Sequence, residues 1–425
     1  TKREYDEMND FLVPNIVKSD ITGTVLDLLT MPNTDNYNKL NVFLGELVDQ
    51  PSFNTIKSSF SRLLFLGAVD RRGSLTSLGK ILSQVGTEEV ELSKALLYSL
   101  VYNCRNDMIK IISMLSLNNQ IDGFFNQELK LEEKSFREKI FKRYKDEEGD
   151  HFTLITIFDH LLENINSIQA IGKNEMDTEI LIENWSYKNY FVNYKDNIKK
   201  VINAYYKTTN EIINNKEIEN YAKTLKKGKN IYYENEYMGL KWKISDVDFN
   251  NHDNCLLKSI LSGYFMNICF KPEAESKKLR KLRPNIENSL YQIPPRKKIL
   301  YNENKSNLIV FTAISNLNRE GLTINTISPI IDKKDVFEIG FHYYLGFKYY
   351  PEQARLILEN LQKNSNKNKI TNIDFIKGEE YMNKELDSSL IIDRYNLELD
   401  KRLIKENEKL SNYKINKKNF IKKKK

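Results

Sequence analysis

Apolar residues recur at helical spacing through most of the first 270 residues, which predicts a series of amphipathic helices. The segment 52–66 has this spacing and is bounded by Pro51 and Gly67, so we expect a helix between them. A shorter helix is expected at 21–29, where Ser19 and Asp20 offer a cap. The same spacing continues in 91–102, 106–117, 152–165, 185–206 and 254–270.

Two stretches depart from the helical pattern. The segment 68–76 has short apolar runs on either side of Arg71, Arg72 and Gly73, which predicts a small hairpin. Two helices followed by a hairpin are typical of a winged helix. After about residue 285, turn residues separate short β-rich runs, which predicts a small antiparallel barrel. The strands expected in this barrel are 289–293, 298–301, 308–314, 321–327 and 337–347.

The net charge of +7 is unevenly distributed along the chain. Residues 401–425 hold eleven Lys and Arg and two Glu, so the other 400 residues sum to −2. The window 277–305 holds nine Lys and Arg and two Glu. Such a cluster can neutralise phosphates. A solvated surface in a Lys-rich protein would give the same pattern, so both interpretations stay open.

Other sequence features restrict the class of protein. The three Cys and four His are too sparse for a disulfide framework or a zinc cluster. We expect an intracellular protein, cytoplasmic or nuclear, because the N-terminus has no apolar signal core and no run approaches the ~18 apolar residues of a membrane helix. The 49 Asn residues suggest an AT-rich genome, such as that of a large DNA virus, and a viral origin would add the virion as a location.

The order of these elements resembles the C-terminal half of DEAH-box and RHA-type RNA helicases. The most specific likeness is the predicted wing, residues 63–80, with the sequence LLFLGAVD followed by GSLTSLGK. Ser186 stands where the family usually has Cys, and Asn15 where it usually has Glu. Further similar stretches follow in the family's order at 13–21, 107–117, 149–154, 185–191 and 260–267.

The resemblance implies a multidomain α+β fold with a winged helix, a ratchet-like helical domain, a small antiparallel OB-type β-barrel and a basic tail. Because the chain begins at Thr1 and not at Met, we expect a fragment or a processed piece. The predicted parts are an exit segment of a missing RecA-like motor domain at 1–18, the winged helix at 19–80, the ratchet-like domain with polar insertions at 81–284, the OB-fold at 285–350 and a Lys/Asn-rich tail at 351–425.

The chain carries no nucleotide-hydrolysis motif. It lacks a Gly-x-x-x-x-Gly-Lys-Ser/Thr loop and an Asp-Glu-Ala-His sequence, and that chemistry needs a phosphate cradle and a carboxylate that holds Mg²⁺. We therefore expect no catalytic residue, metal or cofactor here. The resemblance implies ATP and Mg²⁺ for the missing motor, so the intact protein is expected to be an NTP-hydrolysing helicase.

Five residues are candidates for RNA binding. Arg296, Lys297 and Lys298 fall where the family's OB-fold reaches the RNA, although an exposed turn explains them equally simply. Asn189 lies where the family has an Asn. The family has an Arg about five residues later, where this chain has Tyr194, and Lys195 is the adjacent basic residue. Asn189 could contact a phosphate or satisfy a buried polar site, and both interpretations stay open.

We therefore predict an RNA-binding module of an ATP-dependent DEAH-box RNA helicase, which unwinds 3′ to 5′ when intact. The expected partners are single-stranded RNA, its own or a separate RecA-like motor and a helicase-activating protein, and no membrane. The alternative is a non-enzymatic nucleic-acid-binding or docking module that acts in trans with a motor or a transcription complex.

Overall fold

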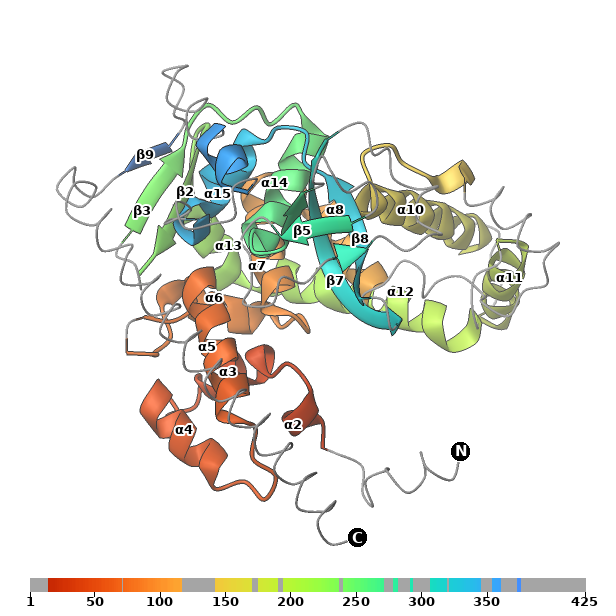
Figure 1. Cartoon of the computed structure of the whole chain (residues 1–425). Helices are drawn as coiled ribbons and strands as arrows, with labels where there is room; N and C mark the ends of the chain where they lie inside the picture. Colours follow the sequence, from red (N-terminus) through yellow and green to blue (C-terminus); the bar gives the residue numbers. More distant parts are fainter. Residues whose placement is uncertain are drawn as a thin grey trace, which may run out of the picture.

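The computed structural model has only helices among the elements named up to residue 224, and strands appear among the described residues from there on (Figure 1). It describes residues 14–70, 72–116, 142–169, 175–189, 194–236, 240–270, 278–281, 291–292, 306–318, 321–344, 354–360 and 373–375. Among these residues, none of the helices combines the length and the apolar character needed to cross a lipid bilayer.

The N-terminal helices form one end of the molecule (Figure 1). The longest, α5 (Phe53–Leu66), begins where the Ser52 hydroxyl accepts a hydrogen bond from the N–H of Thr55, and it ends at Gly67 with a φ of 80°. The helix predicted at 52–66 is thus confirmed. The neighbouring helices are α2 (Asn15–Lys18), α3 (Thr22–Leu28), α4 (Tyr37–Gly45) and α6 (Ser77–Val85).

A tight turn joins α5 to α6, as the hairpin prediction requires. Val69 and Leu75 form an isolated antiparallel bridge, and Gly73 has a φ of 74°. A Cβ on Gly73 would lie 2.7 Å from the Cβ of Tyr37, so the turn and its contact with α4 need glycine.

The central helices pack around α7 (Val90–Val101) and α14 (His252–Tyr264). These two approach closely, because a Cβ on Gly263 would lie 2.0 Å from the Glu91 carbonyl oxygen. The Ser259 hydroxyl donates a 2.7 Å hydrogen bond across this contact to the Ala95 carbonyl. The helices α8 (Arg105–Leu115) and α13 (Lys216–Thr224) contact α7. Against α8 pack α10 (Asp150–Gln169) and α12 (Tyr194–Asn214), and α11 (Glu175–Lys188) contacts both of these.

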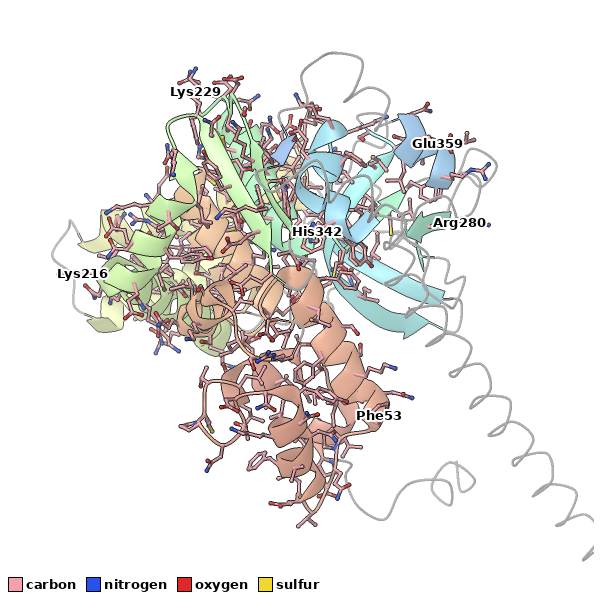
Figure 2. All side chains as sticks on the ribbon, turned by 90° about the vertical axis from the view of Figure 1, so that its left-hand side faces the viewer. Phe53, Lys216, Lys229, Arg280, His342 and Glu359 are labelled. Carbon is pink, nitrogen blue, oxygen red and sulfur yellow. The ribbon has the colours of Figure 1, made fainter. Side chains whose placement is uncertain are left out.

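A four-stranded sheet has the order β1-β2-β3-β9. Its last strand comes from far along the chain, and pairs Phe375 with Trp242 and Ile373 with Ile244. Figure 2 shows Lys229, between β1 and β2, at the opposite end of the molecule from Phe53 on α5. The strands are β1 (Lys226–Lys227), β2 (Asn230–Asn235), β3 (Leu240–Ile244) and β9 (Ile373–Phe375).

Five further strands pair in a ring with the order β4-β5-β6-β8-β7, in which β4 pairs with both β5 and β7. The β6–β8 pair is parallel and the other pairs are antiparallel. A separate cluster of buried apolar side chains, including Phe311, Ile324 and Ile327, belongs to these strands. The strands are β4 (Ile268–Phe270), β5 (Lys278–Lys281), β6 (Tyr291–Gln292), β7 (Leu308–Asn318) and β8 (Gly321–Pro329).

The prediction of a last strand at 337–347 is wrong, because residues up to Tyr344 belong to the helix α15 (Lys334–Tyr344). Its buried side chains include Val336, Ile339 and Tyr343, whose spacing is that of a helix face. Asp332 starts the helix, since its carboxylate accepts a hydrogen bond from the N–H of Lys334. The aromatic residues of the segment favour strands, but the packing of α15 against α14 decides the outcome.

Candidate nucleic-acid interface

Three of the predicted RNA-binding residues, Arg296, Lys297 and Lys298, lie outside the described residues. In the chain they fall between the ring strands β6 and β7. The basic tail at 401–425 lies outside the described residues as well. RNA contact at both places stays a prediction.

Asn189 is buried at the end of α11, and both ends of its side-chain amide have partners within the protein. Its oxygen accepts a 2.6 Å hydrogen bond from the Tyr144 hydroxyl, and its nitrogen donates a 2.7 Å hydrogen bond to the Trp185 carbonyl. These contacts give Asn189 a role in joining α11 to the chain that precedes α10. Its contact with RNA stays a prediction.

His160 on α10 extends this network. Its Nδ1 accepts a 2.8 Å hydrogen bond from the Trp185 indole N–H and lies 3.1 Å from the Tyr144 hydroxyl. Burial raises the pKa of Tyr144, which keeps this hydroxyl protonated as a donor. Because Nδ1 accepts, the neutral ring carries its proton on Nε2.

Lys195 lies in the first turn of α12, which begins at Tyr194. Its side chain lies outside the described part of the structure, so its predicted contact with RNA stays untested. Lys199 and Lys200, one turn further along the helix, are exposed.

The sequence Gly149-Asp150-His151 forms a joint between α10 and the ring strand β8. The Asp150 carboxylate accepts a 2.9 Å hydrogen bond from the N–H of Ile327. His151 Nδ1 lies 2.8 Å from the Ser328 hydroxyl oxygen. Both side chains are buried. The sequence predicts Asp150 as a helix cap, whereas in the structure it is the first residue of α10 and its carboxylate also reaches across to β8.

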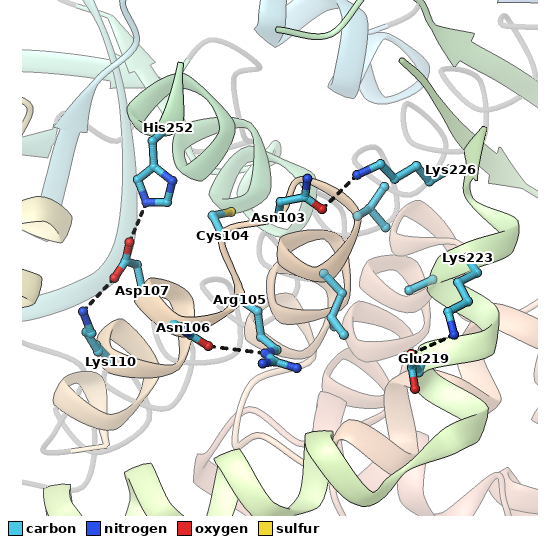
Figure 3. Close-up of a pocket in the computed structure, with 13 residues that line it drawn as sticks. Asn103, Cys104, Arg105, Asn106, Asp107, Lys110, Glu219, Lys223, Lys226 and His252 are labelled. Atoms are coloured by element: carbon cyan, nitrogen blue, oxygen red, sulfur yellow. Dashed lines mark hydrogen bonds and ion pairs between the residues drawn. The ribbon is translucent and has the colours of Figure 1, made fainter. Parts of the chain in front are cut away.

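A pocket of about 620 Å³ opens between the start of α8, the end of α13 and the start of α14 (Figure 3). The sequence does not single out these residues, because they come from three segments, the first of which lies more than 100 positions before the other two. Its lining contains five basic side chains and two carboxylates among apolar and amide groups. The charged or titratable members are Arg105, Asp107, Lys110, Glu219, Lys223, Lys226 and His252.

Carboxylates contact three of these basic groups. Asp107 bonds His252 at 2.5 Å and Lys110 at 2.8 Å, while Glu219 bonds Lys223 at 2.7 Å. Burial alone would raise the pKa of Asp107, but the hydrogen bonds from Lys110 and His252 outweigh it and lower that pKa. Asp107 is therefore ionised at neutral pH. Lys110 also pairs with a second carboxylate, that of Asp159, at 2.8 Å.

Comparisons with known proteins match the helical part of the molecule. Residues 89–154 match the family of the helicase-associated domain (HA2), ratchet-like. ATP-dependent RNA helicase DHX33 of Mus musculus is 25% identical over 161 residues, which cover 37% of this chain and 21% of the relative. The aligned part is thus about a fifth of that relative's length. The matched family segment contains α7, α8 and the Gly149-Asp150-His151 joint.

Proposed function

We propose that this chain is the RNA-binding C-terminal module of an ATP-dependent DEAH-box RNA helicase. The observation that carries the proposal is the match of residues 89–154 to the ratchet-like helicase-associated domain. The relative named as an ATP-dependent RNA helicase supports the same class of protein. In this role the module grips single-stranded RNA while a motor cycles.

The elements on either side of the matched segment support the proposal. Before it, α3, α5 and α6 with the Val69–Leu75 bridge have the order of a winged helix. After it come the ring strands β4 to β8. The first of them, β4, pairs with the fourth, β7, and the third, β6, runs parallel to the fifth, β8. This order suits an OB-fold, a five-stranded Greek-key barrel that binds single strands.

In the proposed arrangement, Arg296, Lys297 and Lys298 contact RNA phosphates beside the ring, and Lys195 does so from α12. ATP and Mg²⁺ are held by a RecA-like motor, in the same polypeptide or in a separate one. The intact enzyme moves 3′ to 5′, and a helicase-activating protein is a further partner. This chain supplies the grip on the strand and not the hydrolysis.

Fluorescence anisotropy of the full chain with single-stranded and duplex RNA, over a salt series, tests this function. The triple variant R296A/K297A/K298A should lower the salt slope for single strands by about 2, at roughly 0.7 per lost contact. The slope for duplex should change less, because the groove of an OB-fold admits an unpaired strand.

The matched control is K80A/K216A/K229A, which removes three exposed lysines from α6, α13 and the β1–β2 turn. It should leave the slope for single strands within about 0.3 of wild type, because none of these lysines is placed beside the ring. Equal slopes for wild type and R296A/K297A/K298A would contradict the proposed grip.

A docking module that acts in trans is the second candidate, and exposed apolar side chains near α4 favour it. Val42 is 63% exposed, Phe53 59% and Val48 fully exposed. Exposed apolar side chains are typical of a protein-binding surface where they form a patch. A chain that co-sediments with a RecA-like motor but binds no RNA would support this function over the first.

A further inference from the structure

Four residues, Tyr144, His160, Trp185 and Asn189, form a closed hydrogen-bond network, which we call the His160 network. His160 Nδ1 accepts a 2.8 Å hydrogen bond from the Trp185 indole N–H and lies 3.1 Å from the Tyr144 hydroxyl. That hydroxyl donates to the Asn189 amide oxygen at 2.6 Å, and the amide nitrogen donates to the Trp185 carbonyl at 2.7 Å. The network therefore ties α10 to the end of α11, at the side of the molecule away from the sheet β1-β2-β3-β9 (Figure 1).

This set of hydrogen bonds requires a neutral His160. An indole N–H can donate a hydrogen bond but cannot accept one, so the imidazole nitrogen that it meets must carry a lone pair. A neutral imidazole has one such nitrogen, and a protonated imidazole has none. The Tyr144 hydroxyl does not remove this restriction, because it gives its own proton to Asn189. Protonated His160 therefore loses the bond from Trp185 in every orientation of its imidazole.

Trp185 is the side chain that this loss affects most. Only 6% of its surface is exposed, and a buried N–H that loses its acceptor is costly. Protonated His160 can still donate to the Tyr144 oxygen, so the proton is accommodated on one side of the network and disrupts the other side. The response that follows is movement of the indole, and with it of the last turn of α11.

Charged residues lie on each of the elements around this part of α10, but among the described residues none is hydrogen-bonded to the imidazole, whose polar partners are a phenol and an indole. They are Arg143 before α10, Asp159 and Glu163 on α10, Lys110 on α8 and Lys188 on α11. Asp159 and Lys110 pair with each other at 2.8 Å. α12 packs on Phe158 and β8 on Asp150, at other positions of the helix. His160 is partly exposed, so protons reach it from solvent.

The helix α12 follows this network closely in the chain. Asn189 is the first residue after α11, and α12 begins soon afterwards at Tyr194. α12 also packs against α11, and it carries the predicted RNA contact Lys195 and the exposed Lys199. Movement of the end of α11 therefore displaces the start of α12.

We propose that His160 is a positioning residue for RNA binding and that it responds to protons. The neutral imidazole holds the end of α11 in place, and protonation releases it and weakens RNA binding by α12. The RNA step deepens the proposed function and rests on it, whereas the release of Trp185 does not. Because the neutral form is the holding form, the contact is lost as the pH falls through the range around 6.5 in which an ordinary imidazole gains its proton.

The test uses the full chain labelled with ¹⁵N, which gives two indole N–H signals because the chain has two Trp. His160→Asn is the variant, since the Asn amide oxygen can lie close to the position of Nδ1 and cannot gain a proton. His252→Asn is the control, because His252 is exposed and pairs with Asp107 outside the network. The signal that H160N shifts at about pH 7.5 is that of Trp185. Circular dichroism at about pH 7.5 and 5.5 establishes that all three proteins are folded.

In wild type and H252N, the Trp185 signal should move between these two pH values, and in H160N it should not. Anisotropy with a twelve-nucleotide uridine RNA, at one salt concentration, follows binding. At the lower pH, wild type and H252N should bind about fivefold more weakly than H160N, and at the higher pH all three should bind alike. Comparison at equal pH removes the gain in positive charge that acid gives to every protein.

A Trp185 signal that does not move in wild type, or that moves equally in H160N, overturns the proposal. Equal affinities of wild type and H160N for RNA at the lower pH overturn it as well. Failure of the proposed function is recognised separately. Wild type then binds no RNA at either pH, and the Trp185 signal alone decides whether His160 holds the end of α11.

Discussion

At the scale of single residues, the joint between α10 and β8 leaves no space for a side chain at Gly149. Its φ is 122°, and a Cβ would lie 2.3 Å from the Ser328 hydroxyl oxygen and 2.7 Å from the Ser328 Cα. We expect Gly149→Ala to lower the free energy of unfolding by about 3 kcal/mol, from backbone strain and the clash together. Urea denaturation measures this loss.

Gly228→Ala is the matched control for this substitution. Gly228 also has a positive φ, 63°, but a Cβ there would meet nothing within 4 Å. The control should therefore cost only about 1 kcal/mol, the price of the left-handed backbone alone. Equal losses for G149A and G228A would show that the joint with β8 contributes nothing.

Two buried carboxyls on α15 should make stability depend on pH. Burial raises the pKa of Asp335 and of Glu338 to about 7, with Lys258 opposing the shift. The folded protein therefore keeps these protons to higher pH than the unfolded chain. The resulting stability is fully present below about pH 4 and is lost as the pH rises through 7.

Glu338→Gln isolates this effect, because glutamine stays neutral at every pH. At pH 8 the variant should be more stable than wild type by roughly 2 kcal/mol, and near pH 4 the two should be similar. Urea denaturation at pH 4, 6 and 8 checks the trend. Glu46→Gln, at an exposed position, should show no such divergence. A constant difference between E338Q and wild type across this range would refute the assignment.

The sequence indicated several important residues but not their partners. Asn189 and Trp185 lie within the stretch 185–191 that resembles the family, and both are buried. Tyr144, which bonds Asn189, precedes it by 45 positions. The sequence predicts Asp150 as a local cap, whereas its carboxylate accepts a hydrogen bond from the N–H of Ile327, 177 positions away. Local spacing predicts helix ends, but contacts of this kind depend on how the elements pack.

At the scale of elements, Arg62 couples α5 to α7. Its Nε and Nη2 lie 3.0 and 2.5 Å from the same Glu91 oxygen, and it also pairs with Asp20 before α3. Glu91 is buried, so Arg62→Met leaves a buried charge without its nearest cation. We expect a loss of about 3 kcal/mol in the free energy of unfolding, measured in urea.

The double variant R62M/E91Q tests the cause, because removal of both charges should recover most of that loss. Lys39→Met is the control, since Lys39 and Asp35 form an exposed pair within α4 and the preceding turn. It should change stability by no more than about 0.5 kcal/mol. A double variant as unstable as R62M would show that packing, and not charge, links the two helices.

Elements whose apolar residues follow one regular spacing were predicted well. Elements without such a regular spacing of apolar residues were not. The helix α5 has regular apolar spacing, a Ser cap and a Gly stop. The segment 207–250 is rich in Lys and Asn, and its sequence did not predict the β2–β3 hairpin that it forms. In β2 the buried positions alternate with partly exposed ones. The helix predicted at 254–270 ends at Tyr264, because Ile268–Phe270 is needed as the first strand of the ring. Whether such a segment forms a helix or a strand depends on the strands far along the chain with which it can pair.

At the scale of the whole molecule, the charge lies largely at one end of the chain. The tail at 401–425 carries +9, and the remaining residues sum to −2. With so little net charge outside the tail, the proposed binding of RNA requires local basic sites such as the window at 277–305. The tail can add affinity for any polyanion, because counterion release does not depend on strand structure.

Deletion of residues 401–425 should therefore weaken binding to single-stranded and duplex RNA alike. The salt slopes should fall by up to about 0.7 per lost contact for single strands and about 0.9 for duplex. A scrambled tail of the same composition should restore both slopes, whereas a tail with Gln in place of its eleven Lys and Arg should not. Anisotropy over a salt series measures all four proteins. A contrary outcome is that the deletion abolishes binding to single strands while R296A/K297A/K298A leaves it unchanged. In that outcome the ring would not bind RNA, and the chain would be a docking module whose basic tail binds polyanions non-specifically.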